Sequence, residues 1–496
     1  MQQYRKLAGQ TALYGMGTIV PRFLNYVVLT PFYTRIFTEA QYGMVTNLYA
    51  YIVFLLILLT YGLETGYFKF TKSEKEPAKV FSTIMVSLFT TTLIFLSLIF
   101  LFQDPVARFL QYTGKSHLIL LFSCVVAFDA ISAVPFAKLR FEEKAKKFGY
   151  LKIFNVGVNL FFNFLFYVIL PYVQQHFPSS PLLLLYDPTM DVAYVLLSNL
   201  LASCFTFLLL IPELRISIRF IAFPLLWRIL RYSLPLLVVG LAGTINEVAD
   251  KELIKRLVPQ DEFPLKQLGI YGANYKLGML MTIFIQMFRY AAEPFYFSKM
   301  RDYDAKTTYA QVMRYFIIFG LLIFLLVTLY IDLFKHFIDT KFYSGLHIVP
   351  IILLANLFLG ISYNLSIWYK LNNLTKYGAL IALTGAGITI TLNILLIPVF
   401  GYEGSAWATL ICYASMMIIS YFLGRKFYFV PYTLQPILFY FVLALALFLM
   451  QNFIHYPSVV HKYVYNSLFL LCFIFIVFRK EHIKIKDIKR FIKERT

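Results

Sequence analysis

Long apolar segments alternate with short polar connections along the chain. A helix needs about 20 apolar residues to cross the hydrocarbon core of a membrane. Segments of about that length lie at residues 11–36, 43–68, 80–102, 117–138, 150–171, 190–212, 232–256, 269–293, 312–334, 346–369, 378–398, 403–424, 434–453 and 461–478. The longest connections, near 172–189, 213–231 and 294–311, are too short for a separate extramembrane domain. The pattern therefore predicts an all-α polytopic membrane protein with about 14 transmembrane helices.

Short sequence matches recur in the two halves of the chain at a near-constant offset. Gly17-Thr-Ile matches Gly243-Thr-Ile, and Gln41-Tyr-Gly matches Ile270-Tyr-Gly. They predict two pseudo-symmetric six-helix bundles related by an axis along the membrane normal, with substrate bound between them. The predicted parts are a bundle at 1–212, a cytoplasmic amphipathic linker at 213–231, a bundle at 232–424, helices 13 and 14 at 425–479, and a basic cytoplasmic tail at 480–496.

The linker and the tail both combine basic and apolar residues. The linker reads RISIRFIAFPLLWRILR from residue 215, and the tail reads EHIKIKDIKRFIKERT beyond residue 480. We expect both to lie in the membrane interface, with their cations near lipid phosphates. Regulation by the linker and partner recognition by the tail are the alternatives.

Composition agrees with a membrane protein, since 60% of the residues are hydrophobic and 14% are charged. A soluble protein has about 25% charged residues. The net charge of +20 is no evidence for nucleic-acid binding, because the cations lie between apolar runs and form no continuous patch. If both termini are cytoplasmic, most of the 45 Lys and Arg residues fall on that side, as the positive-inside rule requires.

One apolar segment, from about residue 233 to 257, carries several charges in its middle. Each charge at a membrane centre costs about 2.5–3.5 kcal/mol on translocon scales. Glu247 and Lys251 have the i,i+4 spacing of a local helix pair, and Asp250 lies on the same side. One acid is then left over and could take up a proton. We expect Glu247, Asp250 and Lys251, together with Asp129 of the fourth helix, to act in gating or ion coupling.

Arg22 lies about 16 Å along the first helix from Thr11, near the middle of the membrane. It could form a structural ion pair with a carboxylate of the seventh helix, or it could contact an anion in a central cavity. Both roles can apply in different states. Under the repeat offsets, Arg22 is equivalent to positions 248–251 of the second bundle. The two bundles thus have opposite charges at equivalent depths, so a gate closed by an ion pair between them is one hypothesis.

Further polar residues of the predicted spans are candidates for substrate contact. Arg289 is spaced i,i+4 from Glu293 and could pair with it, whereas Lys276 has no partner at helical spacing. The amides of Asn25, Asn246 and Asn274 could bind sugar hydroxyls, although membrane amides also join helices. The four cysteines lie in apolar runs without CxxC spacing, so we expect no metal site.

Several stretches resemble bacterial polysaccharide-biosynthesis flippases of the multidrug/oligosaccharidyl-lipid/polysaccharide (MOP) exporter superfamily. They are GTIVPRFLNYVVLTPFYTRIFTEAQYG, YGLETGYFKF, GLAGTINEVADKELIKRLVP and LGIYGANYKLGMLMTIFIQMFRYAAEPFYF. The resemblance implies a MATE-like, V-shaped transporter of the bacterial inner membrane that flips undecaprenyl-diphosphate-linked sugars. Related lipid II flippases carry cavity arginines in helices 1 and 8. Arg22 matches the first by position, and Lys276 and Arg289 are the candidates for the second.

The resemblance leaves three functions to compare. A lipid-linked oligosaccharide flippase is the leading hypothesis, a lipid II flippase differs only in head group, and a drug/cation antiporter should prefer an acidic cavity. A glycosyltransferase or polymerase would need a paired-acid motif or a large outer loop, which the sequence lacks. We therefore expect a monomeric, non-enzymatic transporter without a cofactor. Its partners would be the lipid-linked glycan, membrane lipids and other polysaccharide-assembly proteins, and its coupling to H⁺, Na⁺ or the membrane potential stays open.

Overall fold

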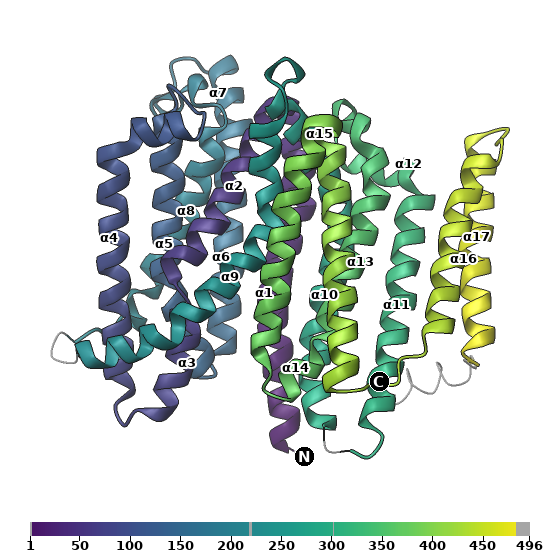
Figure 1. Ribbon diagram of the computed structural model, residues 1–496. Coiled ribbons are helices and arrows are strands. Elements are labelled where there is room, and N and C mark those ends of the chain that lie inside the picture. The colour runs from purple at the N-terminus through teal and green to yellow at the C-terminus, as the bar shows by residue number, and fades with distance from the viewer. Residues whose placement is uncertain (1, 218–220, 301, 483–496) are drawn as a thin grey trace. The chain divides into compact units, whose positions relative to one another are not determined.

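The computed structural model describes residues 2–217, 221–300 and 302–482, and these form helices without any strand (Figure 1). The α-helices are α1 (Gln2–Ile36), α2 (Glu39–Thr60), α3 (Leu63–Ser73), α4 (Pro77–Phe109), α5 (Ser116–Phe141), α6 (Ala145–Phe164), α7 (Leu170–His176), α8 (Ala193–Leu210), α9 (Phe223–Leu257), α10 (Pro264–Lys299), α11 (Ala305–Leu329), α12 (Ile331–Phe334), α13 (Val349–Leu365), α14 (Ile367–Leu371), α15 (Thr375–Phe427), α16 (Leu434–Phe453) and α17 (Val459–Lys480).

The helices account for the predicted membrane spans. Within the described residues, 11 helical stretches are long and apolar enough to cross a membrane. Outside that set, α1 has 35 residues and α10 has 36, which is sufficient length for one span each. The 53 residues of α15 are enough for two spans. The described helices are thus long enough for about 14 spans, and the chain is a multi-pass membrane protein.

Local backbone chemistry explains where two of the spans are interrupted. α2 begins at a capping box in which Thr38 and Gln41 exchange hydrogen bonds of 2.8 and 3.3 Å. It ends where Tyr61 and Gly62 have φ angles of 31° and 74°, and α3 starts directly afterwards. In α15 the break is at Gly401, with φ 54° and ψ −138°. That conformation strongly favours glycine, so this residue separates two spans that were predicted at 378–398 and 403–424.

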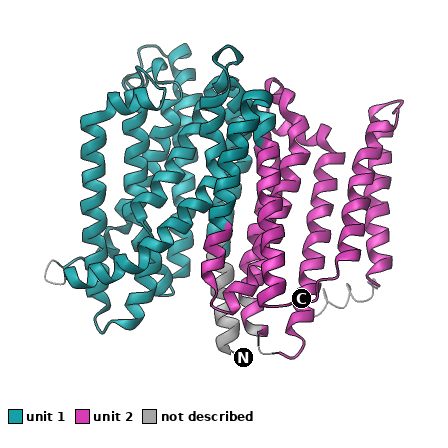
Figure 2. Cartoon of the chain, in the orientation of Figure 1, with its two compact units in different colours: residues 1–272, 382–405 teal, residues 273–381, 406–496 magenta. Residues whose placement is uncertain are grey.

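The chain divides into two compact units, coloured separately in Figure 2. Unit 1 comprises residues 1–272 and 382–405, and unit 2 comprises residues 273–381 and 406–496. The predicted bundles at 1–212 and 232–424 follow the sequence repeat, whereas these units follow contacts. The division into two six-helix bundles therefore stays a prediction.

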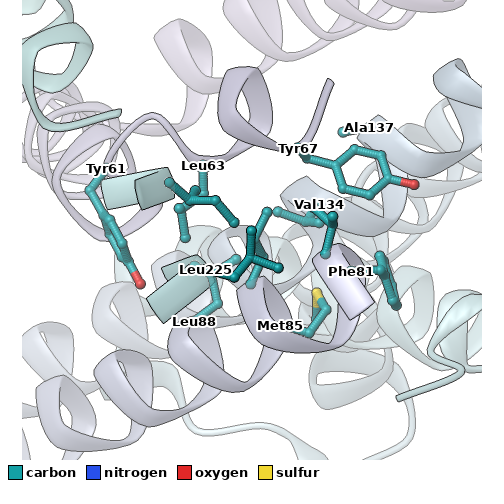
Figure 3. Close-up of a cluster of buried hydrophobic side chains, with 12 residues drawn as sticks. Tyr61, Leu63, Tyr67, Phe81, Met85, Leu88, Val134, Ala137 and Leu225 are labelled. Atoms are coloured by element: carbon teal, nitrogen blue, oxygen red, sulfur yellow. The ribbon is translucent and has the colours of Figure 1, made fainter. Parts of the chain in front are cut away.

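Each unit has its own apolar core. In unit 1, α5 packs against α4 and α8, and α2 packs against α9. Figure 3 shows part of its core, where Leu63, Met85 and Val134 meet near Leu225 of α9. In unit 2, α11 packs against α13, α16 and α17. These packed cores fix the positions of the polar residues described below.

The segment predicted as a surface linker is partly helical. Residues 214–217 and 221–222 lie outside helices, and α9 begins at Phe223 and continues directly into the next span. Figure 1 shows α9 slanting across unit 1. Arg228 in its second turn donates to Glu74 at 2.9 Å, so this cation has a protein partner. The predicted amphipathic tail lies outside the described residues beyond position 482.

Two glycines allow α2 and the start of α10 to cross at backbone contact within unit 1. A Cβ on Gly269 would lie 1.8 Å from the carbonyl oxygen of Glu39, and a Cβ on Gly43 would lie 1.9 Å from that of Leu265. We expect Gly269→Ala to lower the stability by about 1–3 kcal/mol, because backbone atoms must move apart. The thermal midpoint in detergent measures this loss. Gly157→Ala in α6, where nothing lies within 4 Å, should be at least as stable as the wild type.

Candidate functional site

Arg22 belongs to a group of charged residues inside unit 1. Its side chain is exposed on α1, and it interacts electrostatically with Lys152 of α6. Lys152 also interacts with the carboxylates of Asp129 and Glu64. Asp129 accepts a hydrogen bond of 2.7 Å from the Ser203 hydroxyl. The structure therefore brings the predicted residues Arg22 and Asp129 together around Lys152, which lies in the predicted span at 150–171 and was not among the candidate residues.

Two further residues belong to the surroundings of this group. Arg140 donates to Glu64 at 2.6 Å and is the third cation that interacts electrostatically with the others. Asn25 lies one helical turn beyond Arg22, and its side-chain oxygen is buried without a hydrogen-bond donor among the described residues. We call Arg22, Glu64, Asp129, Arg140 and Lys152 the unit 1 charge group. It contains three cations and two carboxylates.

The carboxylate of Asp250 in α9 is hydrogen-bonded by neighbouring residues of unit 1. It is 3% exposed and accepts hydrogen bonds from the Lys251 ammonium at 2.8 Å and from the Tyr271 hydroxyl at 2.6 Å. Lys251 also donates to the backbone carbonyl of Glu247 at 2.8 Å. The adjacent Asp250 is thus one carboxylate that pairs with Lys251, and the Glu247 side chain is exposed. Pairing of Arg22 with a carboxylate of the seventh helix stays a prediction.

The predicted amide contacts join helices in this structure. Asn246 donates to the carbonyl of Ala382 at 3.3 Å and accepts from Thr389 at 3.2 Å, which connects α9 to α15. In unit 2, Asn274 is fully buried and donates to the carbonyl of Phe342 at 2.8 Å. Lys276 follows Asn274 by two residues in α10, and its side chain is half-buried. Asn246 and Asn274 thus make the contacts between segments that were one alternative, and their binding of sugar hydroxyls stays a prediction.

Arg289 lines a pocket of about 330 Å³ in unit 2, including the part open to solvent. Its guanidinium lies 5.0 Å from the Tyr363 ring centroid and 3.5 Å from the Glu293 carboxylate. Lys370 of α14 donates to the same carboxylate at 2.5 Å. The local pair expected from the sequence is therefore present, and a second cation joins it. The wall consists of Ile285, Phe288, Arg289, Ala292, Glu293, Tyr296, Gly360, Tyr363, Asn364, Ser366, Ile367 and Lys370.

Asn364 and Tyr296 complete the polar wall of this pocket. Asn364 is 6% exposed, and its side-chain oxygen accepts a hydrogen bond from the Tyr296 hydroxyl. Its amide nitrogen has no hydrogen-bond partner among the described residues. The positions of Arg289, Glu293 and Tyr296 at i, i+4 and i+7 share one helix face and could have indicated the wall. No sequence spacing indicated Asn364 or Lys370, because they lie in two separate helices, α13 and α14, on either side of a break at Ser366.

Sequence reasoning also missed a buried polar cluster at the end of α9 in unit 1. Glu252 accepts from Asn47 at 3.0 Å and from the Tyr51 hydroxyl, and Arg256 donates to its other oxygen. Lys255 is 2% exposed and donates to the Asn47 side chain at 3.1 Å and to the Leu110 carbonyl. We call Asn47, Tyr51, Tyr112, Glu252, Lys255 and Arg256 the α2–α9 cluster.

Tyr112 ties the loop between α4 and α5 to this cluster. Its hydroxyl donates to Asn47 at 2.7 Å, and its ring lies 3.9 Å from the Lys255 ammonium. Burial and the neighbouring Tyr51 and Glu252 raise the pKa of Tyr112, so that its hydroxyl keeps its proton and remains a donor. The α2–α9 cluster therefore connects three segments through buried polar contacts.

Comparison with known proteins identifies the family. The profile of the polysaccharide biosynthesis protein family matches residues 7–301. The chain belongs to this family. A sequence search of the curated proteins finds no match. The family match covers α1 from residue 7 and all of α2 to α10, and so includes the unit 1 charge group, the α2–α9 cluster and the α10 wall of the unit 2 pocket.

Solved structures show which fold this family member has. The lipid II flippase MurJ in an inward closed conformation is similar with a TM-score of 0.70 and 14% identity, over 95% of this chain and 99% of that one. An inward-facing multidrug resistance MATE family transporter of the MOP superfamily gives a TM-score of 0.64 and 12% identity, over 84% and 94%. The fold is that of MOP flippases and transporters and not of an enzyme.

Proposed function

We propose that this protein is a MOP-type flippase that moves an undecaprenyl-diphosphate-linked oligosaccharide from the cytoplasmic to the outer leaflet of the bacterial inner membrane. The oligosaccharide would be a repeat unit of O-antigen, capsule or another surface polysaccharide. The observation that carries the proposal is the match of residues 7–301 to the polysaccharide biosynthesis protein family. A protein of similar fold is named a lipid II flippase, which supports a lipid-linked cargo for this chain.

The cations inside the helices are suited to a diphosphate head group. Arg22 and Lys152 lie in unit 1, and Arg289 and Lys370 lie in unit 2. Arg presents a planar fork of donors that matches phosphate oxygens, and each such contact replaces part of the water that the anion loses. The polyprenyl tail would stay in the bilayer during transport. Alternating access would then expose the head group to one side of the membrane at a time.

The membrane potential can contribute to export of this cargo. Moving one negative charge outward against an inside-negative potential of 100 mV is downhill by about 2.3 kcal/mol. A diphosphate therefore gains free energy from the potential alone. Coupling to H⁺ or Na⁺ through Asp250 or Glu247 is an additional device that this function does not require.

Depletion of the protein followed by lipid analysis tests the proposed function. We expect a polyprenyl-diphosphate oligosaccharide to accumulate in the inner leaflet, because its synthesis continues while its export stops. Accumulation of lipid II instead would assign the cargo to the alternative head group. Export of a drug cation by the purified protein, without accumulation of any lipid-linked intermediate, would contradict the flippase function.

A further inference from the structure

The unit 2 pocket has more donors than its own carboxylate can use. Arg289, Lys370 and the Asn364 amide all line it, whereas Glu293 is its one carboxylate among the lining residues. The Asn364 amide nitrogen is buried and unsatisfied within the described part of the chain. An unsatisfied buried donor is destabilising, and a ligand with an acceptor atom would remove that cost. The pocket is therefore incomplete as it stands.

Glu293 lies where such a ligand would bind. Its carboxylate is 2.5 Å from the Lys370 ammonium and 3.5 Å from the Arg289 guanidinium. Its side chain is nevertheless 39% exposed, so it can turn away from the pocket without burying an unpaired charge. Arg289 would remain positioned by the Tyr363 ring, whose centroid lies 5.0 Å from the guanidinium. The two cations can thus exchange one carboxylate for another anion.

We propose that Glu293 occupies the binding site of the cargo, and that an anionic oxygen group of the lipid-linked glycan displaces it from Arg289 and Lys370 and accepts a hydrogen bond from the Asn364 amide. This inference rests on the proposed function and adds the residues that select the cargo. A phosphoryl group and the carboxylate of an acidic sugar share the chemistry, since both offer several acceptor oxygens and a negative charge. The Tyr296 hydroxyl donates to the side-chain amide oxygen of Asn364 and so fixes the orientation of this amide. The amide nitrogen then remains available to donate to a ligand.

The displacement predicts an unusual gain of affinity when Glu293 loses its charge. If the Glu293 carboxylate is paired with the two cations about nine-tenths of the time, the apparent dissociation constant of the ligand is about tenfold higher than its intrinsic value. We expect Glu293→Gln to bind inorganic pyrophosphate or glucuronate about tenfold more tightly than the wild type. Calorimetric titration of the detergent-solubilised full chain measures both affinities. The probe that shows the gain identifies the anion as a phosphoryl group or as a sugar carboxylate.

Further variants separate this site from a general effect of charge. Lys370→Met and Asn364→Leu, each combined with Glu293→Gln, should lose the gain because they remove a donor. Asp332→Asn is the matched control, since Asp332 also pairs with two lysines of unit 2, Lys335 and Lys462. It should leave both affinities unchanged. Size-exclusion chromatography confirms that each variant is folded before it is compared.

Two results would overturn the proposal. In the first, Glu293→Gln binds both probes no better than the wild type. In the second, Asp332→Asn gains as much affinity as Glu293→Gln. The titrations need neither lipid nor transport, so their outcome is independent of the proposed function. Conversely, tighter binding by Glu293→Gln in a protein that exports no lipid-linked glycan would leave the anion site intact and refute only the proposed function.

Discussion

Replacing Arg289 by Ala should lower the rate of head-group flipping in proteoliposomes by about 10- to 100-fold at subsaturating lipid. Arg289 lies on the wall of the unit 2 pocket beside Lys370, and its guanidinium is half exposed. A hydrogen bond to a charged group contributes about 1.5–3 kcal/mol, which corresponds to this range of rate. The expected loss is larger than for the neutral Asn364, because a charge and two donors disappear together.

Two variants show whether the loss comes from the fork of donors or from a change in the fold. Arg289→Lys keeps the charge but cannot bind two oxygens in one plane, so we expect it to recover only part of the rate. Lys299→Ala removes another cation of α10 that also pairs with a nearby carboxylate, Asp302, at 2.6 Å. Its rate should equal that of the wild type. Wild-type flipping by Arg289→Ala would exclude this residue from cargo binding.

The spans could be predicted from sequence because a membrane helix depends on a local property. About 20 consecutive apolar residues satisfy the hydrocarbon whatever the rest of the chain does. Even the division of α15 at Gly401 was predictable, since Pro398 and this glycine interrupt a continuous apolar run. The pair of Arg289 and Glu293 could be predicted for the same reason, because one helix contains both residues.

The rest of each site depends on contacts that no local spacing encodes. Asn47 and Glu252 are 205 residues apart and become neighbours only when α2 packs against α9. Lys255 lies at the end of the predicted span at 232–256, where a lysine can reach water, yet it is 2% exposed. Lys152 and Lys370 likewise lie at the ends of predicted spans, at 150–171 and 346–369. A lysine near a helix end can extend into the protein or into water, and the tertiary neighbours decide which.

The α2–α9 cluster should be the most sensitive polar site for stability, with Asn47 as its central residue. Asn47 is fully buried, donates to Glu252, and accepts from Tyr112 and Lys255. Asn47→Leu keeps the volume but leaves a buried ammonium and a carboxylate with fewer partners. Removing a partner from buried charges costs about 3–5 kcal/mol. We expect the thermal midpoint in detergent to fall by several degrees.

Asn155→Leu is the matched control, because Asn155 is half-buried and makes one hydrogen bond, to the Thr206 hydroxyl at 3.0 Å. Its loss should be about 1 kcal/mol, the usual net value of one neutral hydrogen bond. Equal losses for the two variants would mean that Asn47 acts as an ordinary amide and that Lys255 finds other partners. A loss confined to Asn47→Leu would instead show that one amide holds α2, α9 and the loop between α4 and α5 together. In that case, opening of this end of unit 1 requires the buried ammonium of Lys255 to exchange Asn47 for water.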